Sequence, residues 1–355
     1  MVHREGAMTP SFGGRNVLVT GAGGQLGRLV LRRLVASDDI GTVVAVDREL
    51  AAAPPGVDAR RFDFGADPES LAAAAAGVDV LIHLAWRQPD PDGDDPNRPL
   101  LDAVLDACAA ADVAHLVVIS SATVYGAWPH APLPISEVEV LRPNPGFRYA
   151  EVKAEHERRI VRWRRERSTS VSVLRPAAAV ADGQMSWLGQ SLMDAVALRA
   201  GIDDPPVQFL HVDDLASAVV VAAAQQLDGP YNVAPDGWLA GADMRALLGP
   251  RPRLRLPVSV AERVEDWLAS TPSSPRPAGL LPYTMHSWVV SNDRLRSVGW
   301  TPGSHNDEAF VEADQAPPWV ALNARQRQYL SLGVLGAVIV GIVVGVIVAV
   351  VRRRR

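Results

Sequence analysis

Cysteine, lysine and an apolar N-terminal segment are nearly or wholly missing from this sequence. With Cys108 as its only cysteine, the chain of 355 residues cannot form an internal disulfide, which excludes disulfide scaffolds and zinc sites built from several cysteines. Residues 1–14 contain no apolar run of the length that a secretory signal needs, and we interpret them as a flexible tail. Among 35 lysines and arginines, Lys153 is the only lysine, which makes this position conspicuous.

Basic charge is also scarce relative to acidic charge. The formal net charge is −5 although the chain ends in four arginines, so the remaining residues are more acidic still and are not typical of a protein that binds nucleic acid. Hydrophobic residues make up 48% of the chain and charged residues 21%, which excludes a broadly disordered protein. We therefore expect a globular, enzyme-sized unit with no nucleic-acid partner.

A glycine-rich turn follows the first apolar run. Residues 16–20 predict a β-strand and residues 29–34 a helix, and three glycines at G-x-x-G-x-x-G spacing lie between them. The first glycine permits a tight turn, the second lets the backbone approach a pyrophosphate, and the third lets the helix pack close to the strand. The pattern predicts a dinucleotide site, with an ordinary glycine turn as the alternative. The cofactor-binding residues predicted in this turn are Gly21, Gly24, Gln25, Leu26 and Gly27.

The sequence after this turn indicates which dinucleotide binds. Asp47 ends the next predicted strand, residues 42–46, about 20 residues after the glycines, where a carboxylate can accept hydrogen bonds from the adenosine ribose and repel a 2′-phosphate. Arg48 keeps a phosphorylated cofactor possible, so we predict NAD, with NADP as the alternative. Asp63 and Phe64 end a further short segment and could cap the adenine end of the pocket.

Strand and helix patterns alternate through the first half of the chain. Residues 78–84 and 115–120 predict strands, and residues 100–110 predict a helix between them. Such βαβ units form a doubly wound parallel sheet, so we expect an α/β fold of the Rossmann type. We assign residues 15–180 to the dinucleotide-binding domain and 181–310 to a smaller substrate-binding part, from which segment 207–224 returns to the core.

Candidate catalytic residues follow the strand at 115–120. Ser121 comes directly after it, and Tyr149 and Lys153 share one face of a later helix because they are four residues apart. An ammonium beside a phenol favours the phenolate and lowers the tyrosine pKa from about 10, which suits a general base. An ordinary pair on a helix surface is the alternative, but the only lysine of the chain is rarely placed this way by chance.

Taken together, these motifs resemble a known family. The chain is similar to the extended short-chain dehydrogenases/reductases of the NAD-dependent epimerase/dehydratase family, which includes nucleotide-sugar 4-epimerases. The resemblance spans about residues 15 to 302. The matching segments are Thr20–Gly27, Asp79–Ala85, Ser120–Gly126, Tyr149–Lys153, Leu174–Pro176, Phe209–Leu215 and Val298–Pro302.

The resemblance implies a role for each motif. Tyr149 would act as the base, Ser121 would hold the substrate hydroxyl or carbonyl, and Lys153 would bind the nicotinamide ribose while lowering the pKa of the tyrosine. The further cofactor-binding residues that it implies are Leu84, Ala85 and Pro176. It also implies a homodimer whose interface includes the Tyr149 helix.

The function stays open between three alternatives, two of which differ in substrate. The family favours the secondary alcohol of a nucleotide sugar or related sugar. The chain departs from the family in residues 177–183 and at Val207 and Gln208, where sugar-nucleotide members commonly carry an arginine, which favours a sterol-like or lipid-linked alcohol. The third alternative is a membrane-tethered NAD-binding sensor or assembly protein without turnover.

Three other segments bear on the site. Residues 184–206 are apolar and lie where the family builds a substrate lid, although core packing is the alternative. The acidic loop at residues 90–95 lacks the ligand spacing of a calcium loop, and we expect it to be solvated. Asn97 lies where the family has an asparagine, and a surface loop residue is the alternative.

A long uncharged segment precedes the four terminal arginines. Residues 330–351 carry no charged side chain, and a helix of this length rises about 33 Å, enough to cross a hydrocarbon core of roughly 30 Å. A buried core helix is the alternative, but such helices rarely lack a polar face over this length. We therefore predict a transmembrane helix at 330–351, a linker at 311–329 and a basic tail at 352–355.

Two signals disagree on the side of the membrane that holds the body. The terminal arginines favour a cytoplasmic C-terminus, which would place the body outside. The missing signal sequence and a cytosolic cofactor favour a cytoplasmic body, and Arg325 and Arg327 flank the other end of the predicted span. We expect a single-pass C-terminal anchor with the catalytic body in the cytoplasm.

Overall fold

The computed structural model describes most of the chain between residues 10 and 313. The described ranges are 10–50, 53–88, 94–181, 184–196, 198–200, 204–248, 254–269 and 277–313. The predicted transmembrane helix at 330–351 and the basic tail at 352–355 lie outside them, as do residues 1–9 of the predicted tail and most of the predicted linker. Within the described ranges, none of the helices combines the length and the apolar character that crossing a bilayer requires.

The main structural element is a parallel sheet, which confirms the expected doubly wound α/β fold. Among the described residues it has seven strands in the order β11-β6-β5-β4-β1-β2-β3. All neighbouring strands in it pair in parallel. The strands are β1 (Val17–Thr20), β2 (Val43–Asp47), β3 (Val57–Arg61), β4 (Val80–His83), β5 (His115–Ile119), β6 (Ser170–Pro176) and β11 (Gly229–Val233).

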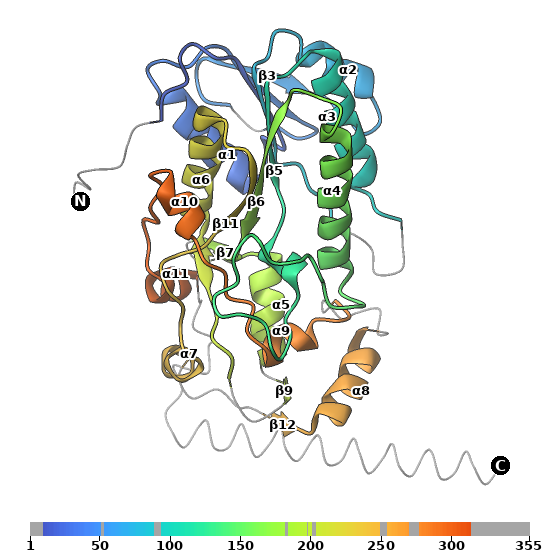
Figure 1. Cartoon of the computed structure of the whole chain (residues 1–355), viewed down its shortest axis with the longest axis vertical. Helices are drawn as coiled ribbons and strands as arrows, with labels where there is room; N and C mark the ends of the chain where they lie inside the picture. The colour runs from blue at the N-terminus through green and yellow to red at the C-terminus, as the bar shows by residue number, and fades with distance from the viewer. Residues whose placement is uncertain are drawn as a thin grey trace, which may run out of the picture.

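Helices cover both faces of this sheet, which explains the nearly continuous apolar runs of the inner strands. Val17 and Val19 of β1 face one hydrophobic cluster, to which α1 (Gln25–Val35) and α6 (Val212–Gln225) contribute. Leu18, between them, faces a second cluster with α2 (Pro68–Ala74) and α3 (Arg98–Ala110). Helix α4 (Arg148–Arg164) lies beside α3 on this second side (Figure 1). The sheet is thus the middle of three layers.

Smaller elements lie beyond the carboxyl ends of the strands, in the lower part of Figure 1. Strands β7 (Ala178–Ala181), β8 (Gln184–Met185) and β10 (Phe209–His211) form one small sheet, and β9 (Leu198–Ala200) pairs with β12 (Leu254–Leu256). The helices of this part are α5 (Trp187–Val196), α7 (Gly241–Leu248), α8 (Val258–Ala269), α9 (Leu281–Met285) and α11 (Asn306–Ala313), whereas α10 (Asp293–Ser297) packs against β11 of the main sheet.

The main sheet with its helices and the smaller part beyond it do not divide at one point in the sequence. Strand β11 joins the main sheet beside β6, although it lies outside the range 15–180 that the sequence assigns to the dinucleotide-binding domain. Helix α6 packs against α1 on the same sheet. The strand order reverses between β1 and β4, which is where open α/β sheets bind ligands at the carboxyl ends of their strands.

Candidate active site

The glycine turn between β1 and α1 is too tightly packed for side chains at three of its positions. Gly21 has a φ of +73°, and a Cβ there would lie 2.4 Å from the backbone nitrogen of Ala85. A Cβ at Gly27 would lie 2.3 Å from the carbonyl oxygen of Gly21. At Gly24 the nearest such contact is 3.4 Å, to the carbonyl oxygen of Gly21, which is an ordinary van der Waals contact, so a methyl group fits there. A Cβ at Gly23 would lie 2.0 Å from the carbonyl oxygen of Glu49, so the turn needs glycine at these three positions and leaves room at Gly24.

The N-terminus of α1 has the properties of an anion-binding site. Gly24 is its N-cap, so no side chain caps the free backbone N–H groups, and its first turn has no acidic residue. Gln25 is exposed beside it, and Leu26 lines the cavity described below. Because the N–H groups and the helix dipole both favour negative charge, the turn fits the pyrophosphate of a dinucleotide.

Two carboxylates end the neighbouring strands, with different surroundings. Asp47 accepts hydrogen bonds from the backbone N–H of Gly23 at 2.9 Å and of Glu49 at 3.3 Å, which directs its carboxylate toward the glycine turn. Asp63 instead accepts two hydrogen bonds from the Arg87 guanidinium, at 2.8 and 2.9 Å. The Asp47 carboxylate thus lies at the glycine turn, whereas the Asp63 carboxylate is held by a neighbouring arginine.

Phe64, predicted at the adenine end of the pocket, has a buried side chain. Its side chain is buried in the second hydrophobic cluster and packs edge-to-face against the His83 ring, with 6.2 Å between ring centroids. The phenyl ring is therefore part of the hydrophobic core, and it packs against His83, the last residue of β4.

A cavity of about 280 Å³ lies where the central strands of the main sheet end. It brings together residues that are far apart in the sequence, from the first helix to α5. The predicted site residues that line it are Leu26, Leu84, Ala85, Ser121, Tyr149, Lys153 and Pro176. The others lie at the glycine turn and at the ends of β2 and β3, outside the lining: Gly21, Gly24, Gln25, Gly27, Asp47, Asp63 and Phe64.

Ser121 and Tyr149 meet in this cavity. Ser121 is the N-cap of the 3-10 turn η1 (Ala122–Tyr125) and accepts hydrogen bonds from the backbone N–H of Thr123 at 3.2 Å and from its hydroxyl at 2.9 Å. Tyr149, in the first turn of α4, lines the same cavity, and the Ser121 hydroxyl lies close enough to its phenol to favour the phenolate. Burial raises the pKa of Tyr149 to about 12, and the nearby Ser121 hydroxyl opposes this rise.

Lys153 is buried one turn along the same helix. Its Nζ donates a hydrogen bond to the carbonyl of Ile119 at 2.8 Å. Burial lowers the pKa of Lys153 to about 7, while the carboxylates of Glu157 and Asp95 oppose this change. The ammonium lies closer to the indole of Trp86 than to the ring of Tyr149, and the lowering of the Tyr149 pKa by Lys153 stays a prediction. Nζ is 3.4 Å from the centroid of Trp86 and 5.9 Å from that of Tyr149.

Trp86 is the site residue that the sequence analysis missed. It follows Ala85 directly, lines the cavity, and packs edge-to-face against Tyr149 with ring centroids 5.6 Å apart. Trp187 of α5 contacts Tyr149 from its own side, at 5.5 Å between centroids. The candidate base thus has an indole on each of two sides. A large aromatic residue directly after the Asp79–Ala85 motif was the only signal in the sequence.

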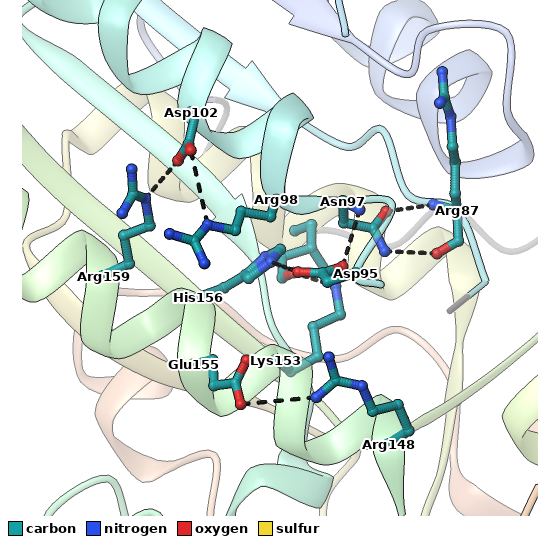
Figure 2. A network of polar contacts seen from close by, with 11 residues as sticks. Arg87, Asp95, Asn97, Arg98, Asp102, Arg148, Lys153, Glu155, His156 and Arg159 are labelled. Carbon is teal, nitrogen blue, oxygen red and sulfur yellow. Dashed lines mark hydrogen bonds and ion pairs between the residues drawn. The ribbon is translucent and has the colours of Figure 1, made fainter. Parts of the chain in front are cut away.

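A hydrogen-bonded pair behind Trp86 was also missed. His156 of α4 donates from Nε2 to the carboxylate of Asp95 at 2.6 Å (Figure 2). The acidic loop was expected to be solvated, but the Asp95 side chain is only 8% exposed. No sequence signal identifies this pair, because its members belong to a loop and a helix that meet only in the folded chain.

Asn97 is buried and hydrogen-bonds the backbone of the segment that follows β4. Its side-chain amide donates to the carbonyl of Arg87 at 2.7 Å and accepts from the backbone N–H of the same residue at 2.6 Å (Figure 2). This pair of bonds ties the segment after β4 to the start of α3. The Asn97 side chain therefore fixes the backbone of Arg87, next to Trp86. Because Asn97 is buried, it is not a surface loop residue.

An ion pair closes the inner end of the cavity. The carboxylate of Glu157 accepts hydrogen bonds from the Arg175 guanidinium, the shortest of them 2.6 Å, and from the Ser120 hydroxyl at 2.5 Å. Both charged side chains are buried. Glu157 is the one carboxylate among the described residues that line the cavity, and its charge is already paired.

Comparisons with known proteins agree with this architecture. A model of the NAD dependent epimerase/dehydratase family matches residues 17–234. The uncharacterized protein y4nG of Sinorhizobium fredii is 28% identical over 249 residues, which is 66% of this chain, and the chain spans 59% of the length of that relative.

Solved structures show the same fold. The UDP-glucose 4-epimerase of Thermus thermophilus, solved with NAD, is 22% identical, with a TM-score of 0.61 over 84% of this chain and 97% of that one. The dTDP-glucose 4,6-dehydratase of Bacillus anthracis, also solved with NAD, is 17% identical, with a TM-score of 0.60 over 84% of this chain and 95% of that one. Because the family match covers more than half of the sequence, the chain belongs to the NAD-dependent epimerase/dehydratase family, as its motifs predict.

Proposed function

We propose that the protein is an NAD-dependent oxidoreductase or epimerase that acts on a secondary alcohol, with Tyr149 as the general base. The observation that supports this proposal is that Ser121, Tyr149 and Lys153 line one cavity, in which the Ser121 hydroxyl favours the phenolate of Tyr149. NAD, when bound, accepts a hydride from the carbon that carries the hydroxyl. An epimerase would return that hydride to the opposite face of the same carbon.

The protein's own groups have distinct tasks in this reaction. Ser121 orients the substrate oxygen, and Tyr149 takes the hydroxyl proton on its phenolate oxygen. Because burial raises the pKa of Tyr149 to about 12, the phenolate needs a nearby positive charge. Lys153, 5.9 Å from the centre of the tyrosine ring, is placed to supply it.

The glycine turn and Asp47 support NAD rather than NADP. The turn at Gly24 and the uncapped start of α1 would hold the pyrophosphate. The carboxylate of Asp47, directed toward the turn, would accept hydrogen bonds from the adenosine ribose and repel a 2′-phosphate. Lys153 would bind the nicotinamide ribose.

For the substrate we propose a nucleotide sugar or related sugar. The proposal is supported by family membership and by similar folds such as the UDP-glucose 4-epimerase of Thermus thermophilus. The reacting hydroxyl would lie at Ser121 and Tyr149, in the cavity beside Trp187.

A sterol-like or lipid-linked alcohol is the second candidate, and the cavity provides a specific reason for it. Its described lining contains no arginine for a diphosphate, and its only carboxylate is paired with Arg175. The rings of Trp86 and Trp187 beside Tyr149 would suit an apolar ring system. In this case residues 330–351 would hold the protein at the membrane where such a substrate resides.

The two candidates and the non-catalytic alternative are separated by one assay. The full chain is supplied with NAD and, in turn, with UDP-sugars and with apolar secondary alcohols in detergent, and both NADH and altered sugars are measured. Interconverted sugars without net NADH would support the epimerase, and NADH formed from the apolar alcohols would support the dehydrogenase.

The Tyr149→Phe variant tests the mechanism in the same assay. We expect turnover to fall by about 10²-fold or more, because the variant lacks the proton acceptor. The NAD affinity, measured by calorimetry, should change little. NAD binding without turnover of either substrate class would favour a sensor or assembly protein, and full activity in the Phe variant would exclude Tyr149 as the base.

Localisation and assembly are proposals from the sequence. We propose that residues 330–351 anchor the protein in a membrane with the catalytic body in the cytoplasm, and that the protein forms a homodimer. Protease treatment of intact and permeabilised cells tests the first, since a cytoplasmic body is cut only after permeabilisation. Light scattering of the purified full chain tests the second.

A further inference from the structure

Trp86 connects the candidate catalytic residues with each other. Its indole ring lies 3.4 Å from Nζ of Lys153 and packs edge-to-face on Tyr149. On a further side, His156 packs against it at 5.9 Å between centroids. An ammonium this close to an indole, in a buried place, gains a cation–π interaction that replaces part of its lost hydration.

The segment that carries Trp86 is held firmly. Arg87, the next residue, has both backbone polar groups bound by the buried Asn97, and its guanidinium forms two hydrogen bonds with Asp63. His156, which contacts the indole, is itself held by Asp95. The position of the indole is therefore set by contacts from the segment after β3, from the N-cap of α3 and from α4.

We propose that Trp86 is a positioning residue of the reaction, whose ring holds the Lys153 ammonium in place beside Tyr149 and shields it from water. The inference rests on the proposed function of Tyr149 and Lys153. Only one donor of the ammonium is used in the hydrogen bond to Ile119, so without the indole the flexible lysine side chain loses its second constraint. A displaced or hydrated ammonium stabilises the phenolate less.

Other charged or titratable groups face Lys153 as well and must be kept constant in the test. They are Glu157 and His156 from α4, Asp95 from the loop before α3, and His83 from β4. Substitutions at Trp86 leave all of them in place, so a change in the behaviour of Lys153 reports on the indole.

The first test uses the fact that Lys153 is the only lysine in the chain. The full chain is treated with an amine-acetylating reagent at fixed pH, and acetylation of Lys153 is followed by peptide mass spectrometry, which separates it from the N-terminus. We expect Trp86→Leu to react several-fold faster than the wild type, because the smaller side chain uncovers Nζ. Trp86→Phe, which keeps an aromatic face, should fall between the two.

Trp163 offers a matched control on the same helix as Lys153. Like Trp86, it has a buried indole N–H without a hydrogen-bond partner and a cation over its ring, the Arg167 guanidinium at 4.8 Å. It does not line the cavity. Trp163→Leu should therefore leave the acetylation rate of Lys153 unchanged. An equal increase in this variant would mean that the effect comes from general loosening of the fold and would overturn the proposal.

The second test separates positioning from a simple wall of the pocket. For Trp86→Leu we expect kcat to fall by about tenfold, with a smaller change in the KM of the substrate, and for Trp86→Phe we expect partial rescue of kcat. A rise in KM with kcat unchanged would make Trp86 only a binding surface and would overturn the proposal.

Failure of the inference and failure of the proposed function are distinguishable. If the wild type shows no NAD-linked turnover, the proposed function fails and acetylation alone decides on the contact with Lys153. If the wild type turns over and both Trp86 variants match it in kcat and acetylation, only the inference fails. If Trp86→Leu does not fold, Trp86→Phe decides, and it must be acetylated faster than the wild type.

Discussion

The carboxylate of Asp95 accepts a hydrogen bond at 2.6 Å from His156, which joins the loop before α3 to the helix that carries Tyr149 and Lys153. The pair is almost fully enclosed, and the negative charge of Asp95 helps to keep the nearby Lys153 protonated. A residue from an acidic loop thereby influences the electrostatics of the candidate active site.

The first prediction concerns this charge. Asp95→Asn should lower the pKa of Lys153 below its value of about 7, because one of the two carboxylates that oppose the effect of burial is lost. If the reaction needs the ammonium, activity is lost as pH rises through this pKa, so the alkaline limb of the kcat profile should move to lower pH. NMR titration of the single lysine provides the direct readout.

Asp102→Asn is the control for this prediction. Asp102 also joins α3 to α4, through the Arg159 guanidinium at 2.5 Å, but it is not among the groups that shift the pKa of Lys153 (Figure 2). Its removal should leave the lysine titration unchanged. An equal shift in both variants would show that the effect comes from helix packing rather than from the charge of Asp95.

The second prediction follows from the lowered pKa of Lys153. Between about pH 7 and the unfolded value of 10.5 the unfolded chain binds a proton at this residue that the folded chain does not, so this lysine makes the free energy of unfolding rise with pH across that window. Lys153→Met should therefore stabilise the protein most below pH 7 and progressively less toward pH 10, while it abolishes turnover. Urea denaturation at pH 6 and pH 9 measures the difference, and an equal effect at both would contradict it.

The third prediction separates two glycines of the same turn. Gly24→Ala adds a methyl group that meets nothing closer than 3.4 Å, so stability should be kept, while NAD affinity falls because the methyl enters the space proposed for the pyrophosphate. Gly27→Ala places its Cβ 2.3 Å from the Gly21 carbonyl and should lower stability itself. Calorimetry with NAD and thermal unfolding measure the two effects. Unchanged NAD affinity in a folded Gly24→Ala protein would argue against this site.

The fourth prediction concerns the buried pair behind the cavity. Arg175→Met leaves the carboxylate of Glu157 buried without its cation and should cost about 3–5 kcal/mol in the free energy of unfolding. The double variant with Glu157→Gln removes both charges and should cost clearly less. Urea denaturation of the single and double variants measures this coupling, and additive losses would show that the pair acts through packing alone.

Some of this molecule follows from its sequence alone, because the determinants are local. The spacing of Gly21, Gly24 and Gly27 after an apolar run predicts the first strand, turn and helix. The interval between Tyr149 and Lys153 places both on one helix that faces the cavity. Apolar runs of strand length, covered by helices on both faces, predict the parallel sheet.

Only the tertiary structure decided which groups surround those residues. The indole of Trp86 lies on Lys153, Asp95 is buried against His156, and β11 joins the sheet from a late part of the chain. No repeating pattern in the sequence predicts these contacts. Each of them joins segments that only the packing of the whole sheet and its helices brings together. The sequence determined which chemical groups the site contains, whereas long-range packing determined their burial, and therefore the pKa values of Tyr149 and Lys153.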